Sequence, residues 1–137
     1  MITLGDVSVY STYMYVNDYL AAEGFETEII PGIPSFCSGA ARAQVALMEG
    51  NEALAIVPSA RENAALKTAF DSFENIVVMK AGNSIGKLRQ MMEERNIPLS
   101  HATVLSRVGM EDEYVGPLDA DREYSYFTTV IIKKEGK

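Results

Sequence analysis

Two short glycine-containing loops are the parts of this sequence best suited to bind a ligand. The first contains Gly5 and Asp6 and directly follows an apolar run at residues 1–4, whereas the second, residues 31–35, follows a strand-like run at residues 25–30. Loops at the carboxyl ends of strands form ligand crevices in α/β enzymes. Gly5 lacks a Cβ and lets a ligand approach the backbone, and Asp6 can accept hydrogen bonds from it. The alternative for Asp6 is a turn residue that bonds its own backbone.

A helix is predicted directly after the first loop. Apolar residues recur at helical spacing over residues 9–20, so Tyr13 and Val16 are expected in the core, and Gly24 is expected to end the helix. Ser11 stands where the loop becomes the helix. It either caps the helix or lies near a substrate.

The second loop is framed by a strand and another helix. Residues 25–30 end in an apolar pair and read as a strand that enters a core, directly before the loop at 31–35. Ser35 is a candidate N-cap for a helix over residues 36–49, which Gly50 is expected to end. The predicted helix is rich in glycine, alanine and serine, and such small side chains allow close packing against a neighbouring element.

Strands and helices alternate through the rest of the chain. Strands are predicted at residues 53–57, 76–79, 102–105 and 124–133, and helices at residues 60–70 and 84–95, the second capped by Ser84 and broken at Asn96 to Pro98. Short apolar strands that alternate with amphipathic helices are typical of α/β proteins. We therefore predict an α/β fold.

The composition is that of a folded protein with one ordinary core. The chain has 137 residues, of which 47% are hydrophobic and 23% charged. No apolar run approaches the roughly 18–20 residues that cross a bilayer, and no basic region followed by an apolar stretch opens the sequence. Cys37 is the single cysteine, which suits a reducing cytosol. We therefore expect a cytoplasmic protein without a membrane partner.

The net charge disfavours nucleic acid as a partner. The charge is −7 at pH 7, and the isoelectric point is near 4.7. Nucleic-acid binding uses clusters of Lys and Arg, and the longest basic run here is Lys133-Lys134 near the C-terminal end. His101 is the one histidine and has no Cys, Asp or Glu at ligand spacing, so no metal site is expected.

Five motifs, taken in order, carry a resemblance to a known family. They are Gly5–Thr12, Ile30–Phe36, Val78–Gly82, Gly109–Glu113 and Ser125–Thr129. The sequence resembles the tetrapyrrole (corrin/porphyrin) methylases, and within them the methyltransferases that act on C-20 of precorrin-2 or cobalt-factor II. The match runs over essentially the whole chain but covers the later part of a usual member, whose opening glycine-rich strand and loop have no counterpart here. One departure is Val7, where the family motif Gly-Asp-Pro has proline.

The resemblance implies an α/β fold in two parts. Residues 1–44 would be the C-terminal remnant of an N-terminal α/β domain, and residues 45–137 a C-terminal methylase domain, an α/β/α sandwich with a mixed sheet. The first part would lack its sheet neighbours and leave an unpaired strand edge. We therefore expect this segment either to be held by a second copy of the chain, in a homodimer, or to be poorly packed.

The implied activity is methyl transfer from S-adenosyl-L-methionine to C-20 of precorrin-2 or cobalt-factor II, a step of cobalamin biosynthesis. The reaction displaces a neutral thioether and depends on alignment more than on acid or base catalysis, so no catalytic residue is assigned. By motif position, the resemblance implies cofactor contacts at Leu4, Gly5, Asp6, Val9, Pro34, Ser35, Lys80 and Gly109. It implies substrate contacts at Tyr10, Ser11 and Thr12.

Other interpretations stay open from the sequence. The chain is alternatively a domain fragment or a non-catalytic remnant that lacks the first cofactor loop. It could also methylate another ring position, or act on RNA or diphthine as other relatives do, although the acidic isoelectric point disfavours RNA. A protein-interaction domain without a ligand has no positive signal.

A tetrapyrrole substrate would require a local basic surface. Early corrinoid intermediates carry many carboxylates, which a net-negative protein repels at long range. Arg42, Lys80, Arg89 and Arg107 are the candidates for this surface, unless they are ordinary solvated charges.

Overall fold

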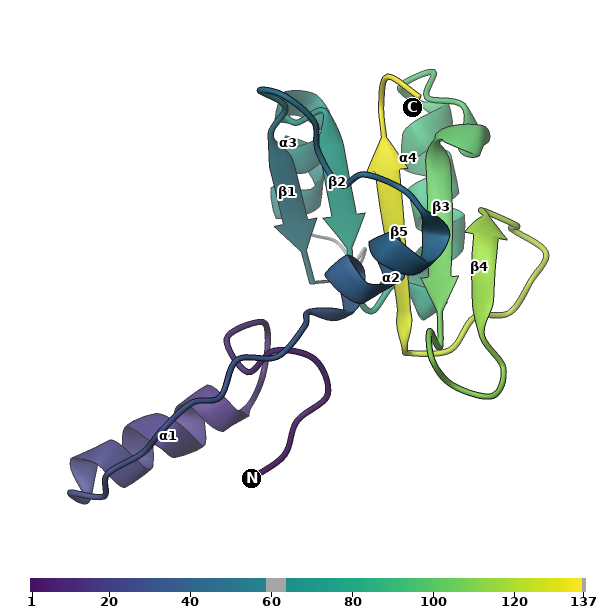
Figure 1. Ribbon diagram of the computed structural model, residues 1–137. Coiled ribbons are helices and arrows are strands. Elements are labelled where there is room, and N and C mark those ends of the chain that lie inside the picture. Colours follow the sequence, from purple (N-terminus) through teal and green to yellow (C-terminus); the bar gives the residue numbers. More distant parts are fainter. Residues whose placement is uncertain (59–63, 137) are drawn as a thin grey trace.

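The computed structural model describes residues 1–58 and 64–136 of the chain (Figure 1). The helices are α1 (Tyr13–Ala22), α2 (Ser35–Ala43), α3 (Ala64–Ser72) and α4 (Ile85–Glu93), with short 3-10 helices at Gly82–Ser84 and Leu99–His101. The strands are β1 (Leu54–Val57), β2 (Asn75–Val78), β3 (Ala102–Ser106), β4 (Tyr114–Pro117) and β5 (Thr128–Lys133). The predicted α/β fold is confirmed. Within the described residues, no helix is long and apolar enough to span a membrane.

The five strands form one mixed sheet in the order β1-β2-β5-β3-β4. β1 and β2 are parallel, whereas β5 runs antiparallel to both β2 and β3, and β4 runs antiparallel to β3. Because β3 and β2 are both antiparallel to β5, they run in the same direction as each other. The carboxyl ends of β1, β2 and β3 therefore lie at one edge of the sheet, where β5 begins.

Helices cover both faces of the sheet (Figure 1). α2 lies across one face, and α3 and α4 lie behind the other. Side chains alternate between the faces along each strand. On β2 and β5, Val78 and Val130 pack with the α3 and α4 side, whereas Val77 and Ile131 pack with the α2 side. This is the expected α/β/α sandwich, and it explains why the central strand β5 is buried throughout.

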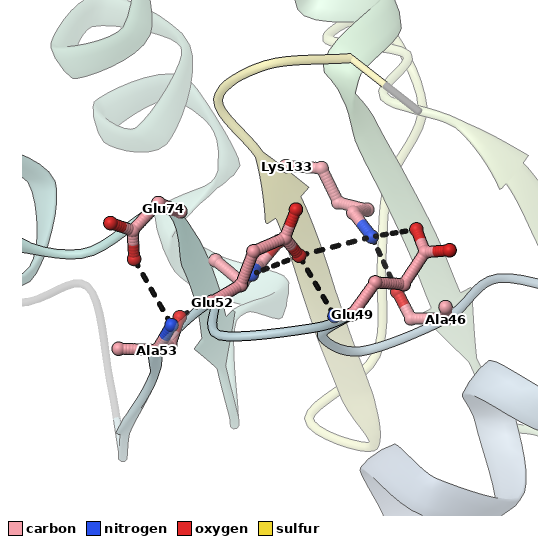
Figure 2. A network of polar contacts seen from close by, with 7 residues as sticks. Ala46, Glu49, Glu52, Ala53, Glu74 and Lys133 are labelled. Carbon is pink, nitrogen blue, oxygen red and sulfur yellow. Dashed lines mark hydrogen bonds and ion pairs between the residues drawn. The ribbon is translucent and has the colours of Figure 1, made fainter.

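The edge opposite the strand carboxyl ends is tied to the loop that joins α2 to β1 (Figure 2). The Lys133 side chain is 6% exposed; its Nζ donates to the carbonyl oxygen of Ala46 at 3.0 Å and lies 3.5 Å from a carboxylate oxygen of Glu49. Glu52 accepts hydrogen bonds from the Glu49 backbone N–H and from the Asn75 side chain. Lys133 is thus part of the sheet rather than of a solvated basic tail.

The first helix differs from the expectation. α1 stands apart from the sheet, and none of its residues is buried (Figure 1). Tyr13 is half-buried and Val16 is 41% exposed, so the prediction that both lie in the core is wrong. α1 also begins at Tyr13 rather than near residue 9, because Tyr10 adopts a left-handed conformation with φ of 52° and interrupts the helical backbone.

The flanks of the second loop also differ. Residues 25–30 form no strand, because no described strand lies beside them to pair with their backbone groups. α2 ends at Ala43, well before Gly50, because Gln44 turns left-handed with φ of 56°. Pro34 occupies the N-cap position, so Ser35 is the first helical residue and not the cap.

Three further features differ from the expectation: one strand, one strand boundary and one helix cap. β4, which pairs with β3, was not predicted, and β5 begins at Thr128 rather than at residue 124. Ser84 stands at the N-cap position of α4 but makes no side-chain capping bond. Residues 60–63, where a helix was expected to begin, lie outside the described residues.

Candidate ligand-binding site

The two glycine loops pack against each other through the Asp6 carboxylate. Its Oδ1 accepts hydrogen bonds from the Ser8 backbone N–H, at 2.8 Å, and from the Ser8 hydroxyl, and its Oδ2 accepts the Gly32 N–H at 2.7 Å. These bonds, the Ser8 hydroxyl first, lower the pKa of Asp6 below its ordinary value because they stabilise the charged carboxylate. Asp6 therefore bonds its own turn, as the alternative interpretation proposed, and joins the second loop to the first.

Glycine at two positions makes this close contact possible. Gly5 has φ of +78°, a conformation that other residues adopt at a cost. A Cβ on Gly32 would lie 2.2 Å from the backbone oxygen of Gly5. The two loops therefore approach backbone to backbone, with no space for a side chain between them.

A cavity of about 320 Å³ opens where these loops meet the carboxyl ends of the strands. Its wall comes from the first loop, from the start of α2, from the segments after β2 and β3, and from the start of β5. The lining includes all residues expected to contact a cofactor except Gly109, namely Leu4, Gly5, Asp6, Val9, Pro34, Ser35 and Lys80. Segments far apart in the sequence thus converge on one hollow.

Gly109 lies beside the cavity rather than in its wall. Its neighbours Val108 and Met110 line the cavity, while the Gly109 N–H donates to a carboxylate oxygen of Glu113 at 2.8 Å. Glu113 also pairs with Arg42 of α2 at 2.8 Å. The hydrogen bond from Gly109, followed by the one from Arg42, lowers the pKa of Glu113. Gly109 therefore has a structural partner that holds this loop.

The three residues expected near a substrate separate into two groups. Tyr10 lines the cavity, and its hydroxyl donates to the carbonyl oxygen of Ile56 in β1 at 3.2 Å. The Ser11 hydroxyl accepts the Tyr13 N–H at 3.2 Å, so it caps the first turn of α1. Thr12 occupies the N-cap position without a side-chain bond, and neither Ser11 nor Thr12 belongs to the cavity lining.

Two of the four candidate basic residues reach the cavity. Lys80 follows β2 and Arg107 follows β3, and both line the hollow. Arg42 is paired with Glu113, and Arg89 is paired with Glu93 on α4, behind the opposite face of the sheet. Among the described residues, the basic side chains that line the cavity are those of Lys80 and Arg107.

A family model for tetrapyrrole (corrin/porphyrin) methylases matches residues 1–121 of the chain. The chain belongs to this family. A probable cobalt-precorrin-2 C(20)-methyltransferase of Methanocaldococcus jannaschii is 34% identical over 139 residues, which cover 98% of this chain and 58% of that protein. A cobalt-precorrin-2 C(20)-methyltransferase of Salmonella typhimurium is 25% identical, over 98% of this chain and 57% of that protein. This tetrapyrrole methylase chain thus spans somewhat more than half the length of these relatives.

Solved structures of tetrapyrrole methylases share the fold. A cobalt precorrin-4 methyltransferase superposes with a TM-score of 0.73 at 16% identity, over 93% of this chain and 60% of that one. A uroporphyrin-III C-methyltransferase of Thermus thermophilus complexed with S-adenosyl homocysteine superposes with a TM-score of 0.68 at 15% identity, over 95% of this chain and 63% of that one. At these identities the likeness establishes the fold.

Sequence reasoning missed the aromatic part of the site in this methylase. Tyr126 and Phe127 line the cavity, are 59% and 49% exposed, and form an edge-to-face pair with ring centroids 5.5 Å apart. The Thr128 hydroxyl below them contacts the Ser106 hydroxyl at 2.8 Å and donates to the Ser125 carbonyl at 2.7 Å. Both aromatic residues belong to the motif Ser125–Thr129, which carries part of the family resemblance. The motif alone predicted no role for their side chains.

Proposed function

We propose that the complete protein transfers a methyl group from S-adenosyl-L-methionine to C-20 of precorrin-2 or cobalt-factor II, in cobalamin biosynthesis. The observation that carries the proposal is the convergence of the two glycine loops and the ends of β2 and β3 on one cavity. Two relatives that carry this activity in their names support the choice of C-20.

The cavity suits the nucleoside part of S-adenosyl-L-methionine. Its volume lies near the lower end of the ~300–1,000 Å³ typical of small-molecule sites. We assign cofactor contacts to Leu4, Gly5, Asp6, Val9, Pro34, Ser35, Lys80 and Gly109. Gly109 lies beside the cavity wall and not in it. The loops supply much of this wall as backbone, which a flat ligand can approach closely where glycine stands.

Methyl transfer requires little from the protein beyond the alignment of the methyl donor with the acceptor carbon. A carbon–sulfur bond breaks as a carbon–carbon bond forms in line with it, and the leaving thioether is neutral. After the methyl group has been transferred, the ring carbon loses its proton to solvent water, which restores its original bonding. The residues around the cavity would hold donor and acceptor in line and exclude water, which accounts for a site without an assigned catalytic acid or base.

Three further parts of the proposal concern the whole protein. We assign residues 1–44 to the end of an N-terminal domain and residues 45–137 to a C-terminal methylase domain, with α2 of the first part packed on the sheet of the second. We also propose a homodimer, supported by the apolar side chains that α1 exposes, and a cytoplasmic location, supported by the single cysteine.

Calorimetry with S-adenosylhomocysteine tests the assignment of the first loop. Wild-type chain is expected to bind, and Gly5→Val to weaken binding by at least about tenfold, or 1.4 kcal/mol, because valine is strained at a positive φ. Gly24→Val is the matched control, since Gly24 has φ of +83° at the end of α1 and no atom within 4 Å of a built Cβ. Equal affinity of Gly5→Val and wild type would remove the first loop from the site.

A non-catalytic remnant is the second candidate. The remnant is favoured by α1, none of whose residues is buried. The first loop precedes α1 and forms part of the cavity wall, so packing holds this part of the wall poorly. Calorimetry with S-adenosylhomocysteine separates the two: absence of binding by this chain alone would support the remnant, and tight binding would exclude it. Methyl transfer from labelled S-adenosyl-L-methionine to precorrin-2 by this chain would also exclude it.

A further inference from the structure

Two cationic residues at the cavity share an unusual backbone conformation. Lys80 has φ of 56° and Arg107 has φ of 53°, a left-handed region that residues with a side chain enter at a cost. Together with Tyr10, they place three of the five non-glycine residues with positive φ in the described chain around one hollow. Such strain at a site is a reason to look for a function there.

The same part of β5 holds both residues in place. The Arg107 N–H donates to the Phe127 carbonyl at 2.9 Å, and the Ala81 N–H, next to Lys80, donates to the Thr128 carbonyl at 2.8 Å. Lys80 and Arg107 therefore flank the start of β5 on its two sides. Two strand spacings of about 4.8 Å put their backbones roughly 10 Å apart.

These two cations are less closely paired with carboxylates than other cations of the chain are. Among the described residues, Lys80 forms no ion pair, and its ammonium group lies 5.8 Å from the centre of the Tyr126 ring. The buried Nε of Arg107 has no hydrogen-bond partner there, and its nearest carboxylate, the 79% exposed Asp112, is 3.7 Å from a terminal nitrogen. In contrast, Arg42, Arg89 and Lys133 each have a closer carboxylate or carbonyl partner.

We propose that Lys80 and Arg107 bind two separate carboxylate side chains of a flat polycarboxylate macrocycle whose ring lies against Tyr126. The inference rests on the proposed function and names the residues that would read the substrate's acidic periphery. A ring that carries carboxylates around its edge can present one carboxylate to each of two cations whose backbones are roughly 10 Å apart. The exposed Tyr126 ring, which lies beside Lys80 in the wall of the same cavity, supplies the apolar surface that such a macrocycle needs.

This arrangement also resolves the charge conflict between protein and substrate. With a net charge of −7, the chain repels a polyanion at long range, so attraction must be local. Lys80 would serve twice, its backbone facing the cofactor side of the cavity and its ammonium group reaching a substrate carboxylate. Arginine suits the second position because its guanidinium can bind a carboxylate with two hydrogen bonds.

Porphyrin fluorescence with uroporphyrin I tests the inference, because every peripheral side chain of this ring ends in a carboxylate. Coproporphyrin I has the same ring with fewer carboxylates. The test variants are Lys80→Met and Arg107→Gln, and the matched controls are Lys87→Met and Arg89→Gln, which remove the same charges from α4. Calorimetry with S-adenosylhomocysteine is measured on every variant.

Each test variant is expected to weaken uroporphyrin I binding by about tenfold, since a hydrogen bond to a charged group is lost. Coproporphyrin I and S-adenosylhomocysteine should lose less affinity, the controls should match wild type, and the salt dependence of uroporphyrin binding should become shallower. Unchanged uroporphyrin affinity in both test variants, or an equal loss for all three ligands, overturns the inference.

The proposed function fails separately from this inference. If wild type binds S-adenosylhomocysteine but not uroporphyrin I, the carboxylate subsite is wrong and the cofactor assignment stands. If uroporphyrin I binds through Lys80 and Arg107 but S-adenosylhomocysteine does not bind, the subsite stands and methyl transfer by this chain is wrong. If neither S-adenosylhomocysteine nor uroporphyrin I binds, both the carboxylate subsite and methyl transfer by this chain are wrong.

Discussion

The Asp6 carboxylate joins two loops that are far apart in the sequence. It accepts hydrogen bonds from Ser8 in its own turn and from Gly32 in the second loop. The lowered pKa of Asp6 means that the charged carboxylate stabilises the arrangement in which the two loops are in contact. This stabilisation is fully present above the ordinary pKa of a carboxyl group. It is lost as the pH falls through the lowered native value.

The pH dependence of ligand affinity follows from this. Affinity for S-adenosylhomocysteine should be constant down to about pH 4, near the ordinary pKa of an aspartate, and decline below it as Asp6 is protonated. Asp6→Asn should weaken binding at neutral pH and flatten that decline, as measured by calorimetry between pH 3 and 8. Asp18→Asn removes the same charge from the exposed α1 and should leave the profile unchanged. A steep acid decline that persists in Asp6→Asn would assign it to another group.

Gly32→Ala tests the close approach of the loops. The added Cβ would meet the Gly5 backbone oxygen at 2.2 Å, so the loops must separate, and affinity for S-adenosylhomocysteine should fall by about tenfold or more. Gly86→Ala on α4 is the control, because nothing lies within 4 Å of its built Cβ. It should raise the free energy of unfolding by roughly 0.5–1 kcal/mol without affecting affinity. Equal ligand affinity of Gly32→Ala and wild type would show that the loops tolerate separation.

At the scale of elements, the sandwich depends on how the loop after α2 is held. α2 covers one face of the sheet and contributes Ser35 and Ser38 to the cavity, while the loop that follows it crosses the far edge to reach β1. Lys133 at the end of β5 fastens that loop through Ala46 and Glu49 (Figure 2). The last strand therefore anchors an element that forms part of the site.

Lys133→Met should destabilise the fold. The Ala46 carbonyl oxygen loses the Lys133 hydrogen bond, and Glu49 loses its nearby cation, so the free energy of unfolding should fall by about 1–3 kcal/mol. Urea denaturation followed by circular dichroism measures the change. Lys87→Met, which removes an exposed lysine of α4, is the control and should change stability by less than about 0.5 kcal/mol. An equally small effect for Lys133→Met would mean that other contacts hold the loop.

At the scale of the whole molecule, two regions differ sharply in packing. The sandwich of residues 35–58 and 64–136 buries β2 and β5 completely, whereas residues 21–33 are exposed throughout. Large apolar side chains of the N-terminal segment, residues 1–34, stay uncovered, among them Tyr15 at 77%, Tyr19 at 65% and Phe25 at 63% exposed. This exposed apolar surface supports the proposal that the segment contacts a second copy of the chain.

Hydrogen exchange should separate these regions. In a dilute, monomeric sample, amides of residues 1–34 should exchange far faster than those of β2 and β5, because local opening there exposes little apolar surface. If a second copy covers the segment, its protection should rise with protein concentration as sedimentation detects a dimer. A monomer in which residues 1–30 are fully protected would contradict both the poor packing and the proposed homodimer.

The sequence predicted the sandwich well because its signals are local. Four of the five strands contain runs of apolar, often β-branched residues, and the stripe of Ile85, Leu88 and Met92 identified α4. Glycine and aspartate in ordered motifs predicted which loops meet at the cavity, since Asp6, Ser35 and Lys80 do line it. Such features depend on a few consecutive residues and are visible without coordinates.

What tertiary structure decided depends on partners that the sequence does not name. Residues 25–30 have the pattern of a strand, but a strand forms only where another strand accepts its hydrogen bonds. β4 was missed because its glycine and proline obscure the pattern, and pairing with β3 overrides them. The four candidate basic residues were equivalent in sequence. Only the fold paired Arg42 and Arg89 closely with carboxylates, at 2.8 and 2.7 Å, and placed Lys80 and Arg107 at the cavity, because distances in the folded chain decide which charges meet.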